Sequence, residues 1–185
     1  MTVLPANALI VLDTNVLLHL LKGHATGLAI ERALRLSSRP ERPLLSSIVE
    51  GELRGLAAGW KWGPSRLALL EERLAELVPV SAGAPEVVRA YGELYAHQSA
   101  LGRRTGENDL WIAATASAVG GIVLTCDGDF MRFDGDRVRW IHVDVATAAL
   151  TASWCRPPPP PVPRSRHGRP APLSAGPGSP GRRRG

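Results

Sequence analysis

The chain has 185 residues, of which 44% are hydrophobic and 21% are charged, with a formal net charge of +5. This length suits one domain with an ordinary core and excludes a long repeat array. The sequence contains no run of about 18 apolar residues and no amino-terminal secretion signal. Its two cysteines, Cys126 and Cys155, form neither a C-x-x-C pair nor a disulfide framework. We therefore expect a cytoplasmic protein without membrane association.

The positive charge is concentrated at the carboxyl end. Residues 156–185 contain seven of the 22 basic residues and none of the 17 acidic ones, which leaves residues 1–155 with a net charge of −2. The same segment holds ten of the sixteen prolines, so it has too little apolar surface to offset the entropy of ordering. We predict one folded domain over residues 1–150 and a disordered Pro/Gly/Arg-rich tail over residues 156–185.

Short apolar runs alternate with longer stretches in which apolar residues have helical spacing. The runs fall at residues 8–12, 43–45, 77–80, 122–124 and 138–143, and the helical spacing occurs at residues 16–21, 67–77 and 87–95. This alternation predicts a mainly parallel central sheet in a three-layer α/β/α fold. In such sheets, ligand sites form beyond the carboxyl ends of the strands.

Acidic residues stand at the positions that this fold would bring to that edge. Asp13 directly follows the first run, and Asp127 and Asp129 follow the run at 122–124. Asp109 opens an apolar helix, and Glu52 lies in the helix that follows the run at 43–45. Because the carboxyl ends of parallel strands share one edge, we expect these carboxylates to lie close together.

Each acidic residue also has a purely structural interpretation. Asp13 and Asp109 suit the start of a helix, where the backbone N–H groups and the dipole favour a carboxylate. Asp127 and Asp129 suit a turn, and Glu52 suits an exposed helix face. Ser47 and Glu50 have the spacing of a capping box for the helix that contains Glu52.

A cluster of three or four carboxylates needs neutralisation, because each close pair repels by about 4 kcal/mol at an effective dielectric constant near 20. Raised pKa values or bound cations can supply it. Oxygen ligands without paired histidine or cysteine favour Mg²⁺ or Mn²⁺ over zinc. Such a metal site suits phosphoryl chemistry, in which the ion activates water and offsets charge on the attacked phosphate.

Four short motifs together resemble a known family. They are Leu12-Asp13-Thr14-Asn15, Glu52-Leu53-Arg54-Gly55, the segment from Asn108 to Ala114, and the segment from Leu124 to Phe130. In this order and at these distances they resemble the PIN-domain ribonucleases, and within them the VapC-type toxins of toxin–antitoxin pairs. The resemblance covers roughly residues 7–145.

The resemblance implies a site and an activity. The implied ligands of one or two Mg²⁺ ions are Asp13, Glu52, Asp109 and Asp127, with Asp129 as the alternative to Asp127. Thr125 would hydrogen-bond within the site, and Asn15 would orient the neighbouring loop. The implied activity is metal-dependent hydrolysis of RNA phosphodiester bonds by a homodimer, whose VapB-type antitoxin covers or disturbs the acidic site.

Other interpretations remain open at this point. Because the acidic residues of the site would repel RNA, we expect arginines at the rim of the site to hold it. Arg54, Arg103 and Arg104 are candidates, although each could equally be a solvated surface residue. A catalytically inactive PIN-like module that binds RNA or protein is the alternative function. Phosphoaspartyl phosphatases and receiver domains also place an aspartate after the first strand. They need a lysine late in the chain to balance the charge of the phosphoryl group, and no lysine follows Lys61 here.

Overall fold

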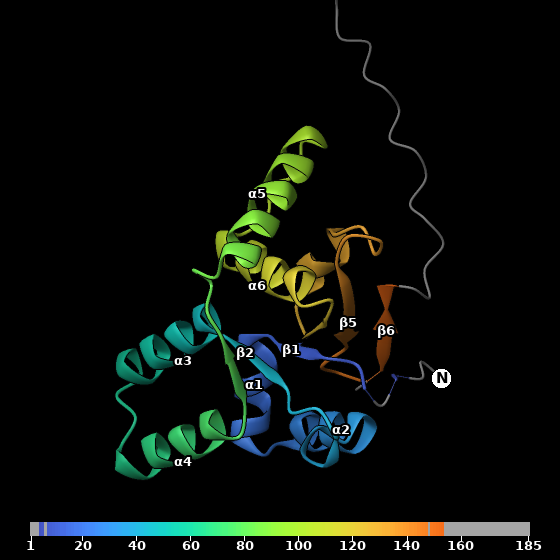
Figure 1. Cartoon of the computed structure of the whole chain (residues 1–185). Coiled ribbons are helices and arrows are strands. Elements are labelled where there is room, and N and C mark those ends of the chain that lie inside the picture. The colour runs from blue at the N-terminus through green and yellow to red at the C-terminus, as the bar shows by residue number, and fades with distance from the viewer. Residues whose placement is uncertain (1–3, 6, 148, 154–185) are drawn as a thin grey trace, which may run out of the picture.

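The computed structural model describes residues 4–5, 7–147 and 149–153 (Figure 1). The predicted tail at residues 156–185 lies outside them, so the division into a domain and a tail stays a prediction. The strands are β1 (Ile10–Leu12), β2 (Leu44–Ser46), β3 (Val78–Val80), β4 (Ile122–Thr125), β5 (Arg139–Val143) and β6 (Leu150–Ala152). Each of the five predicted apolar runs therefore overlaps a strand, whereas β6 was not predicted.

Helices connect the strands. They are α1 (Thr14–Lys22), α2 (Ala25–Leu34), α3 (Ser47–Gly59), α4 (Pro64–Ala75), α5 (Pro85–Ala100) and α6 (Glu107–Ala118), with short 3-10 helices η1 (Leu36–Ser38) and η2 (Gly128–Arg132). In Figure 1, α5 and α6 lie on one side of the sheet, and α1 and α2 lie on the other. The predicted three-layer α/β/α fold is confirmed.

The strand order is β3-β2-β1-β4-β5-β6. The first five strands are parallel, and β6 pairs antiparallel with β5 at one edge. Val11 of β1 stands between Leu44 of β2 and Val123 of β4, so β1 is central. All residues of β1, β2 and β4 are buried, as expected for parallel strands covered on both faces. The carboxyl ends of these three strands are therefore neighbours.

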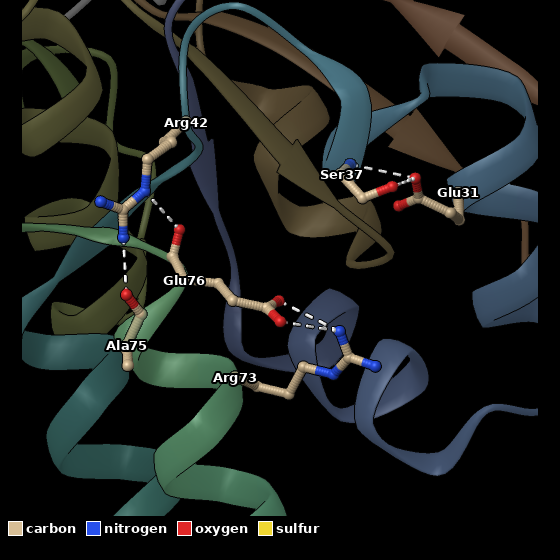
Figure 2. A network of polar contacts seen from close by, with 6 residues as sticks. All are labelled: Glu31, Ser37, Arg42, Arg73, Ala75 and Glu76. Atoms are coloured by element: carbon tan, nitrogen blue, oxygen red, sulfur yellow. Dashed lines mark hydrogen bonds and ion pairs between the residues drawn. The ribbon is translucent and has the colours of Figure 1, made fainter.

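A network around Arg42 holds the start of β2 against the end of α4 (Figure 2). The Arg42 guanidinium donates to the carbonyl oxygens of Glu76 at 2.8 Å and Ala75 at 2.6 Å, which the helix itself leaves without partners. Arg73 and Glu76 form an ion pair of 3.0 Å on the same turn. A cation at the carboxyl end of a helix also complements its dipole. The network thus fixes the chain where it enters β2 and where it leaves α4 for β3.

Candidate active site at the carboxyl edge of the sheet

The fold brings the predicted acidic residues to one edge of the sheet. Asp13 follows the last residue of β1, and Asp127 lies two residues beyond the end of β4. Glu52 lies in the second turn of α3, which starts directly after β2, and Asp109 lies in the first turn of α6. Four segments far apart in the sequence thus supply one group of carboxylates.

Asp13 is the most deeply buried member of this group, with 4% of its surface exposed. Its Oδ2 accepts hydrogen bonds from Thr125 Oγ1 at 2.6 Å and Asn15 Nδ2 at 2.9 Å, and its Oδ1 accepts from the Thr14 N–H at 2.6 Å. Burial raises the pKa of Asp13 from 3.8 to about 6; the bonds from Thr125 and Thr14 lower it, and repulsion from Glu52 adds to the rise. Asp13 therefore caps α1 and also faces the other carboxylates.

Glu52 is held at both carboxylate oxygens. Thr14 Oγ1 donates to its Oε2, and Asn108 Nδ2 donates to its Oε1 at 2.6 Å. These bonds connect α3 with the first residues of α1 and α6. Neither Thr14 nor Asn108 was predicted to take part in the site, although each stands beside an acidic residue in the motifs quoted above.

Asp109 is half-buried, and its carboxylate has no hydrogen-bond or ion-pair partner among the residues that the structure describes. Burial raises its pKa to about 6, and repulsion from Asp13, Asp127, Asp129 and Glu52 contributes to the rise. A side chain carbon at Gly106 would lie 2.8 Å from Asp109 Oδ2, so the absence of a side chain there leaves room for this carboxylate.

Two aspartates follow β4, and their surroundings differ. The Asp127 N–H donates to Thr125 Oγ1 at 2.8 Å, and repulsion from the Asp127 carboxylate raises the pKa values of both Asp13 and Asp109. Asp129 forms an ion pair of 3.1 Å with Arg132, and its repulsion is found at Asp109 but not at Asp13. This arrangement favours Asp127 as the fourth member of the cluster.

Asn15 connects the two loops that carry Asp13 and Asp127. Its Nδ2 donates to Asp13, and its Oδ1 accepts from the backbone N–H of Cys126 at 2.9 Å. The amide therefore ties the residues after β4 to the first turn of α1. Together with the bond from Thr125 to Asp13, it fixes the spacing between these two acidic residues.

Two of the three predicted rim arginines have side chains that are paired elsewhere. Arg54 forms ion pairs with Glu50 at 2.9 Å and with Glu71 of α4 at 2.5 Å. Arg103 forms an ion pair of 3.2 Å with Asp134, and the carbonyl oxygen of Arg104 accepts a bond from Arg132. Within the described ranges, none of the three side chains contacts the acidic cluster, and their contact with RNA stays a prediction.

The predicted capping box is wrong by one residue. Ser46, and not Ser47, is the N-cap of α3, with its Oγ accepting from the Ile48 N–H at 3.4 Å. Ser47 Oγ instead accepts from the Ala82 N–H at 3.0 Å. Ser46 ends a fully buried strand, so its hydroxyl is the one that can reach the first turn from inside the fold. Glu50 pairs with Arg54, which leaves Glu52 as the acidic residue of α3 that faces the cluster.

The donor chemistry of the cluster fits a hard divalent cation. All its charged groups are carboxylates, which Mg²⁺ and Mn²⁺ prefer. None of Asp13, Glu52, Asp109 and Asp127 has an ion pair with a basic side chain in the part of the chain that the structure describes. As the side chains stand, no group of three described histidine, cysteine, aspartate or glutamate residues is arranged to hold an ion. The donors therefore fit by chemistry and charge, and closing around an ion would require their side chains to move.

Within residues 4–5, 7–147 and 149–153, no helix is long and apolar enough to cross a bilayer.

Comparisons with known proteins agree with this geometry. The model of the PIN domain family matches residues 10–136. Ribonuclease VapC5 of Mycobacterium tuberculosis is 35% identical over 129 residues, which cover 68% of this chain and 87% of that protein.

Solved structures with a similar fold include two VapBC proteins. VapBC2 from Rickettsia felis, bound to a DNA fragment from its promoter, is 27% identical with a TM-score of 0.60, and the match covers 67% of this chain and 92% of that one. VapBC-5 from Mycobacterium tuberculosis, a member of the VapBC family of toxin–antitoxin systems, is 30% identical with a TM-score of 0.55. The match covers 74% of this chain and 99% of that one. The chain therefore belongs to the PIN-domain family, and within it to the VapC-type proteins.

Proposed function

We propose that this protein is a metal-dependent endoribonuclease that hydrolyses RNA phosphodiester bonds, and that it is the toxin of a toxin–antitoxin pair. One observation carries the proposal: Asp13, Glu52, Asp109 and Asp127 meet at one edge of the sheet without a basic partner among the described residues. The name of the 35% identical relative, a ribonuclease, supports the same activity.

The need for a cation follows from the charges. Burial and mutual repulsion disfavour ionised Asp13 and Asp109, and a divalent ion between the carboxylates would remove that penalty. When bound, Mg²⁺ or Mn²⁺ lowers the pKa of water and offsets the negative charge of the attacked phosphate. Asp13, Glu52, Asp109 and Asp127 are the residues that would hold it.

The chain's own contacts suggest different tasks for the acidic residues. Asp13 is fixed by Thr125 and Asn15, and Glu52 is fixed by Thr14 and Asn108, so these two form a rigid part of the site. Asp109 has no such bonds within the described chain, and its oxygens remain open as acceptors. Asp109 can therefore accept a hydrogen bond from a water molecule and orient it towards the phosphate.

The partners follow from the same family membership. The structures similar to this chain include VapBC complexes from two organisms, which supports a VapB-type antitoxin as the partner. We propose that this antitoxin covers or disturbs the acidic cluster and that the toxin itself is a homodimer.

RNA cleavage by the purified protein tests the proposal. Sequencing of RNA ends after incubation with Mg²⁺ should show new ends with the wild type and none with Asp13→Asn, which removes one charge but keeps the shape of the side chain. Asp136→Asn, at an exposed site, is the matched control and should cleave like the wild type. EDTA should stop cleavage, and added Mg²⁺ or Mn²⁺ should restore it. A wild type that binds RNA or its partner tightly but cuts no RNA would instead indicate an inactive binding module.

A further inference from the structure

Two neighbouring helices lead away from the acidic cluster. At one end, Thr14 of α1 donates a hydrogen bond to Glu52 of α3. At the other, Lys22 Nζ of α1 lies 5.8 Å from the ring centroid of Trp60, which follows the last residue of α3. Because a helix rises about 1.5 Å per residue, Lys22 lies roughly 14 Å from Asp13 along α1. This distance corresponds to a few nucleotides of an RNA strand.

A pocket of about 560 Å³ opens at that far end, within the size range of ligand sites, about 300–1,000 Å³. Its lining includes Leu21, Lys22, His24, Trp60, Trp62 and Arg66. The Trp60 side chain is 51% exposed, whereas Trp62 packs against the hydrophobic core. Their ring centroids are 6.0 Å apart with an angle of 37° between the planes. A large aromatic face is thus presented to solvent beside a supporting ring.

The charge of the pocket is positive. No carboxylate lines it, and Lys22, Lys61 and Arg66 form no ion pair with any carboxylate in the described part of the chain. Of the three arginines first expected to hold RNA, Arg54 and Arg103 are neutralised by glutamate or aspartate, whereas Arg104 forms no ion pair within the described residues. Lys22 and Arg66 therefore lie beside the tryptophans and remain available to a phosphate.

The turn between α3 and α4 holds the two tryptophans in place. Lys61 stands between them with a φ of 52°, in the left-handed region that lysine adopts only at a cost. Its N–H donates to the Ala58 carbonyl at 3.0 Å, and the Trp62 N–H donates to the Ala57 carbonyl at 2.9 Å, which closes the end of the helix. Strained backbone at a non-glycine residue is commonly found at functional sites.

We propose that this Trp60 pocket is a second contact site for the RNA substrate, where one unpaired base stacks on Trp60 and Lys22 and Arg66 contact the adjacent phosphates. Aromatic faces combined with cations are the usual means of holding single-stranded nucleic acid. An acidic catalytic edge repels RNA, so the substrate needs a cationic contact elsewhere on the molecule. Bases in a duplex are stacked on each other and cannot use the ring. The inference rests on the proposed ribonuclease function.

The test measures RNA binding separately from cleavage. The binding of a short fluorescent single-stranded RNA of mixed sequence is followed by anisotropy in EDTA. Trp60→Ala should weaken binding roughly 5- to 100-fold, the range expected for losing one stacked base, and Trp60→Phe should keep most of the affinity. Lys22→Gln should reduce the slope of log Kd against log salt by about 0.7, as for one lost phosphate contact. Tyr95→Ala, at an equally exposed aromatic residue of α5, is the control and should bind normally.

The outcomes separate this inference from the proposed activity. With Mg²⁺ present, Trp60→Ala should raise KM and leave kcat nearly unchanged, because the base does not touch the reacting atoms. If the wild type binds RNA through Trp60 but cleaves none, the nuclease proposal fails and the pocket assignment stands. Unchanged RNA affinity in Trp60→Ala overturns the inference. The inference is also overturned if Trp60→Ala weakens the binding of duplex RNA as much as that of single-stranded RNA, or if it weakens only the binding of the antitoxin.

Discussion

The side chain of Asn108 donates a 2.6 Å hydrogen bond to Glu52, which lies 56 residues earlier in the chain. Thr14 binds the other oxygen of the same carboxylate, so Glu52 is held from two different helices. A hydrogen bond to a carboxylate that ligates a metal orients the carboxylate and favours its charged form. Asn108 is therefore a positioning residue for the acidic cluster.

Asn108→Ala should lower the affinity for Mg²⁺ by about 10- to 100-fold, the usual effect of removing such a supporting bond. Titration calorimetry of the metal-free protein measures it. Ser117→Ala, at the exposed other end of α6, removes a polar group without a partner in the cluster and should bind Mg²⁺ like the wild type. Equal affinity in Asn108→Ala and Ser117→Ala would show that the contact with Glu52 does not support metal binding.

Gly106→Ala should displace the carboxylate of Asp109. The added carbon would lie 2.8 Å from Asp109 Oδ2, so that side chain must rotate, while the backbone of Gly106 is in a region that alanine adopts freely. We expect weaker metal binding and slower cleavage with an almost unchanged melting temperature. The matched variant is Gly51→Ala in α3, where the added carbon meets no atom within 4 Å. Normal cleavage by Gly106→Ala would mean that cleavage does not depend on the position of the Asp109 carboxylate.

The contribution of Asp13 to the stability of the metal-free protein should fall as the pH rises. The pKa of Asp13 is raised from 3.8 to about 6, so between these values the folded protein binds more protons than the unfolded chain. The free energy of unfolding should therefore decrease by up to about 3 kcal/mol from this group as the pH rises from about 4 through about 6. Urea unfolding at several pH values measures it.

Asp13→Asn provides the comparison, because asparagine has no charge to desolvate. Its unfolding free energy should depend less on pH over the same interval, and near neutral pH it should equal or exceed that of the metal-free wild type. A pH profile identical to that of the wild type would show that the Asp13 charge is not the source of the effect.

The positions of Asp13 and Asp127 could be predicted from the sequence because each follows an apolar run that forms a buried parallel strand. Parallel pairing alone then places both at one edge. The assignment of Glu52 and Asp109 to the site depended on the motifs as well as on the predicted fold, since a glutamate or aspartate near the start of a helix has structural explanations of its own.

The contacts that shape the site could not be predicted in the same way. The bonds from Thr14 and Asn108 to Glu52 join residues 38 and 56 positions apart, and they depend on how the helices pack. The pairing of Arg54 with Glu71 likewise depends on the turn between α3 and α4. The N-cap of α3 is Ser46 and not Ser47, because α3 begins directly after the last residue of β2 with no connecting residue between them.

Binding of Mn²⁺ to the EDTA-treated, dialysed protein, measured by titration calorimetry, shows directly whether the four carboxylates hold a divalent ion. We expect saturable binding near neutral pH by the wild type and by Asp136→Asn, and its loss in Asp13→Asn and Asp109→Asn. At about pH 6, binding should also release protons, because the ion displaces those held by carboxyl groups with raised pKa values. No binding by a folded wild type, or equal binding by Asp13→Asn, would mean that the acidic cluster is not a metal site.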